Sequence, residues 1–156
     1  MSRQSLSLST LLLLILFAAC TLSGRTLSAA TLAGRVTAVK SGELFQLKAA
    51  DGRLRMIKLL GILTPSSDKQ QFGSAKRHLN MLIAGRRVRV EYKTVLSNGV
   101  ILGTVNYGGA DIALRMLESG LAAVADRAYL KPEMLEIYLE AESLAKRRKM
   151  GFWQIK

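Results

Sequence analysis

Alternating apolar and polar residues follow the N-terminal segment of the chain. Three segments alternate in this way and are predicted to be strands: residues 34–40, 43–49 and 53–62. In the second segment Phe45 and Leu47 fall on one face, and polar residues fall mainly on the other. Asp51-Gly52 is a strong two-residue hairpin signal, and Ser41-Gly42 is a further turn. The pattern therefore predicts a meander of three strands.

A helical period comes next along the chain. Apolar residues three and four apart predict an amphipathic helix over residues 70–84, which Gly85 ends. Clean alternation then predicts a strand over residues 86–93. The Asn98-Gly99 hairpin signal leads to a returning strand over residues 100–107. The chain thus has five predicted strands, with one helix between the third and the fourth.

Two helices are expected in the C-terminal part. Asp111 is placed to cap a short helix that ends at Ser119. Pro132 stands where a first-turn proline belongs, before a long amphipathic helix over residues 133–149. Five short strands and three helices predict a small α+β fold, a β-barrel covered by helices.

The N-terminal segment has the composition of an export signal. The apolar run from Leu11 to Ala19 is too short to span a bilayer, and Arg3 precedes it. Two small residues then lead to Cys20, an arrangement that resembles a bacterial lipobox, in which the cysteine is lipidated. We therefore expect a lipoprotein-type signal peptide over residues 1–20 and a membrane anchor at Cys20. The alternative is simple export, with cleavage near Ala30 and a periplasmic or secreted product.

Domain boundaries follow from the same composition. Residues 21–33 are rich in Ser, Thr and Ala without a period, which indicates a tether. The folded domain is expected over residues 34–156.

The net charge of the chain indicates the class of its binding partner. The 156 residues include 23 Lys and Arg against 11 Asp and Glu, a formal net charge of +12. This excess favours an anionic partner, either nucleic acid or another polyanion. Most of it lies within residues 35–93, which hold 13 basic and 4 acidic residues. We expect an exposed basic surface on the strands 53–58 and 86–93 and on the first helix. Its residues are Arg53, Arg55, Lys76, Arg77, Arg86, Arg87 and Arg89.

Cysteine and histidine usage excludes two classes of small domain. One Cys cannot form an intramolecular disulfide, and one Cys with one His cannot form the usual zinc site. No metal site and no small-molecule cofactor are expected.

Several stretches resemble the staphylococcal nuclease (thermonuclease-like) family, in this order and spacing. They are Gly34–Val39, Lys58–Ile62 followed by Pro65, Ser119–Val124, and Ala141 through Lys146 to Trp153. The resemblance covers essentially residues 34–153. It implies an OB-fold five-stranded barrel with three helices, and a calcium-dependent nuclease activity on DNA or RNA.

The residues at the family's active-site positions differ from the family pattern. The resemblance puts metal carboxylates and a water-activating carboxylate at Glu43, Leu63 and Ser66. It puts the two phosphate-binding arginines at Lys58 and Val100. One carboxylate does not hold calcium firmly, and a lysine lacks the bidentate fork of an arginine. The resemblance therefore implies a catalytically degenerate domain.

Three functions stay open at this point. The leading hypothesis is an exported, lipid-anchored monomer that binds nucleic acid or another polyanion without cutting it. The first alternative is a divergent metal-dependent phosphodiesterase that uses Glu43, Lys58 and a substitute carboxylate at Asp68, with calcium as its cofactor. The second alternative is an envelope protein-interaction domain. For Asp68 we expect a helix cap, and for Glu43 a salt bridge to Lys58 across adjacent strands.

Overall fold

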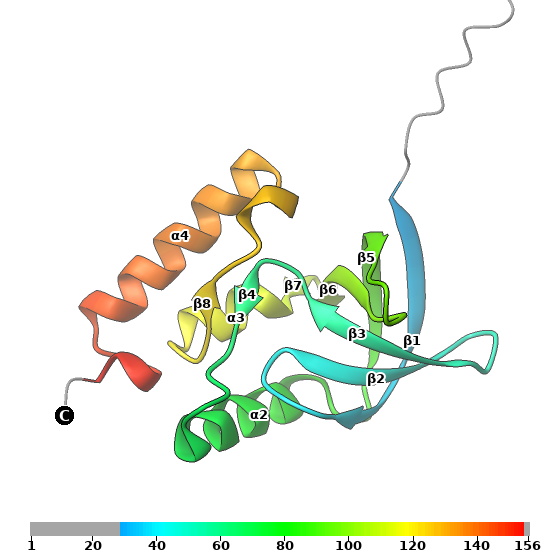
Figure 1. Cartoon of the computed structure of the whole chain (residues 1–156), viewed down its shortest axis with the longest axis horizontal. Coiled ribbons are helices and arrows are strands. Elements are labelled where there is room, and N and C mark those ends of the chain that lie inside the picture. Colours follow the sequence, from blue (N-terminus) through cyan, green and yellow to red (C-terminus); the bar gives the residue numbers. More distant parts are fainter. Residues whose placement is uncertain (1–28, 155–156) are drawn as a thin grey trace, which may run out of the picture.

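The computed structural model describes residues 29–154 as a closed five-stranded barrel with three helices (Figure 1). The barrel strands are β1 (Ala30–Val39), β2 (Leu44–Ala49), β3 (Leu54–Leu59), β5 (Arg87–Val95) and β6 (Ile101–Tyr107). Their order is β3-β2-β1-β5-β6, and a parallel pairing of β3 with β6 closes the barrel. A two-residue strand, β7 (Ala110–Asp111), pairs antiparallel with the end of β6. The predicted OB-type α+β fold is confirmed.

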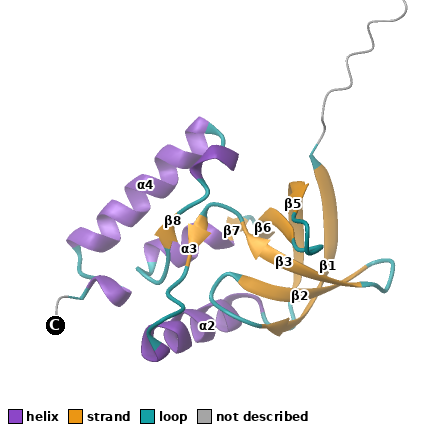
Figure 2. Cartoon of the chain, viewed as in Figure 1, coloured by secondary structure: helices purple, strands orange, loops and turns teal. Residues whose placement is uncertain are grey.

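Three helices lie to one side of the barrel (Figure 2): α2 (Lys69–Ile83), α3 (Ile112–Glu118) and α4 (Pro132–Arg147). α2 contacts β1, α3 contacts β6, and α4 packs on α3. α2 follows β3 and precedes β5, so the predicted position between the third and fourth barrel strands is confirmed. The expected caps also form. The Asp68 carboxylate accepts the Gln71 N–H at 2.9 Å, and Asp111 accepts the N–H groups of Ala113 and Leu114. Two 3₁₀ turns, η1 (Arg127–Tyr129) and η2 (Gly151–Trp153), precede and follow α4.

The core lies inside the barrel and beneath the helices. Phe45 and Leu47 are fully buried, as the alternation predicts. Val88 and Val90 point inward from β5, which leaves the basic residues of that strand outside. None of the helices in residues 29–154 is long and apolar enough to cross a membrane.

The predicted strand over residues 53–62 is in fact two strands. β3 ends at Leu59, and the short β4 (Ile62–Leu63) pairs instead with β8 (Ala123–Val124). Gly61 makes the break with φ of +83°, and a Cβ there would collide with the Leu130 and Tyr138 side chains. The backbone therefore bends away from the barrel wall at a position that only glycine tolerates.

The boundary between tether and domain is also corrected. β1 begins at Ala30, not near Gly34, because residues 30–35 pair with β5 from Tyr92 back to Arg87. The small residues of this stretch have no period of their own, and the pairing with β5 imposes the extended conformation. The predicted signal peptide, Cys20 and most of the predicted tether lie outside the described residues.

The ends of α3 and α4 meet at two glycines. Gly120 and Gly151 both have positive φ, and a Cβ on either would collide with backbone of the other's segment. The Phe152 N–H donates to the Gly120 carbonyl at 3.1 Å. Glu142, which is buried on α4, accepts the Val124 N–H and the Lys146 ammonium. These contacts fix β8, and with it the segment that follows β8.

Candidate functional site

Glu43 is held in place immediately before β2. Its backbone N–H and that of Leu44 donate to the Ser41 hydroxyl, and its carbonyl accepts the Leu59 N–H at 2.8 Å. Its carboxylate accepts the Thr64 N–H at 2.8 Å. Because both its backbone and its side chain are fixed, Glu43 cannot turn away from the neighbouring strand β3.

Lys58 lies between two carboxylates. Its ammonium is 3.9 Å from Glu43 Oε1 and 3.6 Å from Asp126 Oδ2. The side chains of Glu43, Lys58 and Asp126 are 16%, 25% and 32% exposed, so all three are partly shielded from water. We call these three residues the Lys58 cluster. The expected ion pair between Glu43 and Lys58 is confirmed, and Asp126 is an additional partner.

Asp126 reaches the cluster because of the way β8 ends. β8 pairs with β4, and the Ala125 N–H donates to the Gly61 carbonyl at 2.9 Å. Asp126 follows directly, in the left-handed backbone conformation with φ of 48° that Asp tolerates better than most residues. Its Oδ2 atom is buried and accepts no hydrogen bond from the described residues 29–154, so the Lys58 ammonium is its compensating charge.

Opposing effects act on the pKa of Glu43 in the Lys58 cluster. Burial raises the pKa of the Glu43 carboxyl above its ordinary value, and the Thr64 N–H and the Lys58 ammonium oppose this shift. The Asp126 carboxylate adds to the rise. The single ammonium of Lys58 therefore serves two carboxylates, and the cluster contains no excess cation that is free to bind a phosphate.

The other predicted site residues are placed differently. Leu63 lies on β4 with 53% of its surface exposed, and Ser66 is exposed in the loop that follows. Val100 is half-buried just before β6, where its N–H donates to the Asn98 side chain. Asp68 caps α2 and lines a groove beside Leu121 and Phe152. The structure therefore brings Glu43 and Lys58 together. The other three family positions hold an apolar or neutral side chain, at Leu63, Ser66 and Val100.

A calcium ion does not fit this set of donors. Calcium takes six to eight oxygen ligands, several of them carboxylates. The cluster offers two carboxylates, and each already faces the Lys58 ammonium. Within residues 29–154 no three Asp, Glu, His or Cys side chains gather as a metal-binding group.

The sequence model of the family described as "Staphylococcal nuclease homologue" matches residues 56–155. The chain belongs to this family. It is also similar to a protein named "Probable endonuclease LCL3" from Verticillium alfalfae (strain VaMs.102), with 31% identity over an alignment that covers 81% of the chain. The chain spans about half of that relative's length, since 55% of it is covered.

The two strands that carry most of the predicted basic surface of this family member are not neighbours in the barrel. β3 and β5 do not pair with each other, because β6 lies between them. Arg55 lies at the β2–β3 hairpin, where it pairs with Asp51 at 2.7 Å, and Lys76 and Arg77 are exposed on α2. The expected surface shared by strands 53–58 and 86–93 is therefore not built from adjacent strands.

A different set of cations is adjacent. Arg87 on β5 is directly opposite Arg35 on β1, and Arg35 is directly opposite Lys48 on β2. Arg89 follows Arg87 on the same face of β5, opposite Asn106 on β6. We call Arg35, Lys48, Arg87 and Arg89 the β1–β5 basic face.

Sequence reasoning misses three of these functional candidates. Asp126 follows β8 in the sequence without a motif of its own. Arg35 and Lys48 count toward the charge of the barrel half, but nothing in their local pattern distinguishes them. Only the register of β1 against both β2 and β5 shows that they are neighbours, and that register depends on residues far apart in the chain.

Proposed function

We propose that this member of the staphylococcal nuclease homologue family binds nucleic acid without hydrolysing it. The observation that carries the proposal is the Lys58 ammonium, which lies 3.9 Å and 3.6 Å from the two carboxylates of the cluster. An internal cation there supplies the positive charge that the two carboxylates would otherwise take from a metal ion. A divalent cation would have to displace it against Coulomb attraction from both sides.

Transition-state stabilisation would also be lacking. The resemblance places two phosphate-binding arginines at Lys58 and Val100, and neither residue presents a guanidinium. Removing one donor of developing negative charge typically costs roughly 10²–10³ in rate. Lys58 is engaged with carboxylates, and Val100 is apolar, so both sources of stabilisation would be missing together.

Binding is supported by separate observations. The formal net charge is +12, and the family assignment concerns nuclease-like domains. Electrostatic binding of this kind is tolerant of sequence and falls steeply with salt. We therefore expect DNA or RNA to bind at low ionic strength and to dissociate as salt rises.

The decisive experiment measures nucleic-acid cleavage and nucleic-acid binding with the same protein preparation. The full-length protein, purified in detergent, is incubated with labelled single-stranded and duplex DNA and with RNA, with calcium and separately with a chelator. We expect a salt-dependent shift in fluorescence anisotropy and intact nucleic acid in both conditions. Cleavage with calcium that the chelator stops would overturn the proposal.

Calcium binding has its own test. A ligand present at a hundred times its dissociation constant stabilises the folded state by about 2.7 kcal/mol. The donor set predicts no such effect, so millimolar calcium should leave the thermal unfolding midpoint unchanged. Magnesium at the same concentration is the control for a general ionic effect. An upward shift specific to calcium would show that a metal site forms after all.

The divergent phosphodiesterase is the second candidate, because Glu43 and Lys58 do lie together. It requires Asp68 as a further carboxylate, and Asp68 is engaged with the N-terminus of α2. If cleavage is found, the variants Glu43→Ala and Asp68→Ala decide whether these residues are responsible. If neither cleavage nor nucleic-acid binding is found, the protein-interaction hypothesis takes precedence.

We propose the cell envelope as the place of action, with Cys20 as a lipid anchor. The support is the apolar run up to Ala19 and the small residues before the cysteine. Mass spectrometry of the protein from membranes of a bacterial host should find an N-terminal lipidated Cys20, and Cys20→Ser should move the protein to the soluble fraction. An unmodified N-terminus at Thr31 would support cleavage near Ala30 instead.

A further inference from the structure

Like charges meet across three strands of the barrel. In the β1–β5 basic face, Arg87, Arg35 and Lys48 stand directly opposite one another along one row of the sheet. All three side chains are exposed, and adjacent strands are separated by only about 5 Å. Like charges in directly opposed positions destabilise a sheet. The fold therefore tolerates a repulsive arrangement on this row.

Carboxylates do not relieve this repulsion. Five ion pairs join side chains within residues 29–154, and none of them includes Arg35, Arg87 or Arg89. The Arg35 guanidinium donates to the Gly85 carbonyl at 2.9 Å, which holds the side chain in place without neutralising it. A bound anion would supply the missing negative charge.

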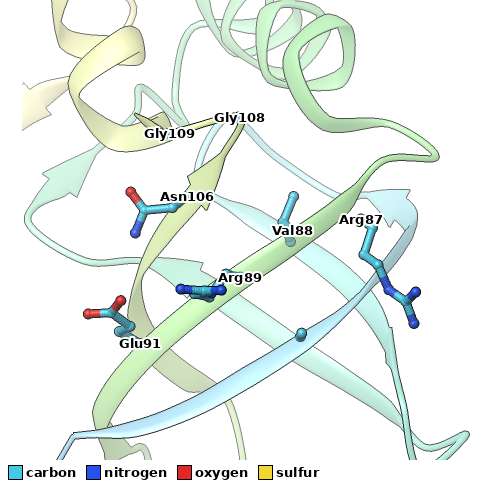
Figure 3. A pocket seen from close by; sticks show the side chains of 8 residues that line it. Arg87, Val88, Arg89, Glu91, Asn106, Gly108 and Gly109 are labelled. Atoms are coloured by element: carbon cyan, nitrogen blue, oxygen red, sulfur yellow. The ribbon is translucent and has the colours of Figure 1, made fainter.

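A groove begins at this row and continues toward β6. Its volume is about 520 Å³, and it is lined by Ala33, Arg87, Val88, Arg89, Glu91, Asn106, Gly108 and Gly109. Figure 3 shows the side chains of Arg89, Glu91 and Asn106 projecting to the same side of β5 and β6, with Arg87 extending toward β1. An arginine beside an amide gives several hydrogen-bond donors, which suits the oxygens of a phosphodiester.

The end of the groove is a tight turn. Gly108 and Gly109 both have positive φ, as a two-residue hairpin between β6 and β7 requires. Tyr107 comes just before this turn with 37% of its surface exposed, and the Arg86 guanidinium lies 5.8 Å from the centre of its ring. The Tyr107 ring lies outside the groove lining but is one residue from Gly108, so a strand that leaves the groove at this turn can stack a base on it.

From this geometry we infer that the β1–β5 basic face and its groove bind the phosphate backbone of single-stranded nucleic acid. The inference rests on the proposed function and gives it a location, on the outer wall of the barrel and apart from the Lys58 cluster. Arg35, Lys48 and Arg87 contact successive phosphates, and Arg89 with Asn106 holds the strand in the groove. Glu91, which is exposed at the groove wall, weakens the binding.

The test compares two triple variants of the full-length protein that lose the same charge. Arg35→Gln/Arg87→Gln/Arg89→Gln removes three cations of the face. Arg53→Gln/Lys76→Gln/Arg77→Gln removes three exposed cations elsewhere. The probe is a short fluorescent oligodeoxythymidine, measured over a salt series, and thermal unfolding verifies that both variants are folded.

The face variant should bind roughly tenfold or more weakly, and the slope of log affinity against log salt should fall by about 2, since each phosphate contact contributes about 0.7 for single strands. The control variant should retain most of both. In addition, Glu91→Gln should strengthen binding. Equal losses in the two triple variants would overturn the inference and leave the proposed function standing. Absence of salt-dependent binding by the unaltered protein would remove both.

A second measurement needs no variant. Bound oligodeoxythymidine should protect Arg35, Arg87 and Arg89 from modification by phenylglyoxal, as mapped by mass spectrometry, whereas Arg77 should stay reactive. Phosphatidylserine vesicles serve as the competing polyanion. If vesicles protect these arginines and the oligonucleotide does not, the face binds a lipid surface and the inference is wrong.

Discussion

The Lys58 cluster and the β1–β5 basic face treat charge in opposite ways. In the cluster one ammonium faces two carboxylates, and all three groups are partly shielded from water. On the basic face three exposed cations oppose one another, and within residues 29–154 no ion pair includes Arg35 or Arg87. In the first arrangement opposite charges compensate one another within the fold, whereas the second leaves like charges to be compensated by a bound anion.

An active nuclease would hold its metal ion and attract the phosphate of its substrate at one place, and in this protein the corresponding charges lie in two separate regions. At the position where the family resemblance puts metal and phosphate, the charges are internally satisfied. The capacity to attract an anion lies instead on the outer wall of β1, β2 and β5. Changes in the cluster should therefore alter stability, and changes on the face should alter binding.

The largest effect is expected from Lys58→Met, which leaves Glu43 and Asp126 facing each other without a cation. Breaking a buried pair from one side costs about 3–5 kcal/mol, and the partial exposure of these groups reduces this to about 1–2 kcal/mol. Urea unfolding measures the loss. Lys58→Arg, which keeps the charge, is the matched control and should lose much less. Equal stability of Lys58→Met and the unaltered protein would show that the cluster is not a stabilising element.

A smaller effect of opposite sign is expected from Arg87→Glu on the basic face. The new carboxylate would stand opposite Arg35 and exchange a repulsive pair for an attractive one. Such cross-strand pairs contribute roughly 0.2–1 kcal/mol, so the variant should be slightly more stable and should bind oligodeoxythymidine more weakly. Arg77→Glu on α2 makes the same charge change away from the row. If both variants are stabilised equally, general charge repulsion and not the row is responsible.

The smallest effect is the pH dependence of stability that Glu43 contributes. Because its pKa is raised in the folded state, the folded protein binds this proton more tightly than the unfolded chain. The resulting stabilisation is present below the ordinary pKa and is lost as pH rises through the folded-state value. The unfolding midpoint of the unaltered protein minus that of Glu43→Gln should therefore be largest below the ordinary carboxyl pKa of 4.5 and decrease toward neutrality. A difference that increases with pH would show that the Lys58 ion pair outweighs burial.

Much of the barrel is predictable because its signals are local. Period-two alternation places Phe45, Leu47, Val88 and Val90 inside, and the cap residues Asp68 and Asp111 begin their helices as expected. The start of β1 at Ala30 is not predictable in this way, because residues 30–33 become a strand only through pairing with β5.

The candidate sites show the same limit. Glu43 and Lys58 are predictable as a pair, since β2 and β3 are joined by a short hairpin that fixes their register. Asp126 joins them through the β4–β8 ladder and its left-handed backbone, both of which depend on tertiary contacts. The row of Arg87, Arg35 and Lys48 likewise depends on a pairing across about fifty residues.

That same pairing has a kinetic consequence. β1 lies in the middle of the sheet, between its sequence neighbour β2 and the distant β5, and the barrel closes only when β3 meets β6. The β1–β2–β3 meander can form early from local contacts, but both its outer strands keep unpaired edges until β5 and β6 arrive. Folding rates fall as such non-local contacts increase, so barrel closure should limit the rate. Until then the meander presents open edges on which a second chain can assemble.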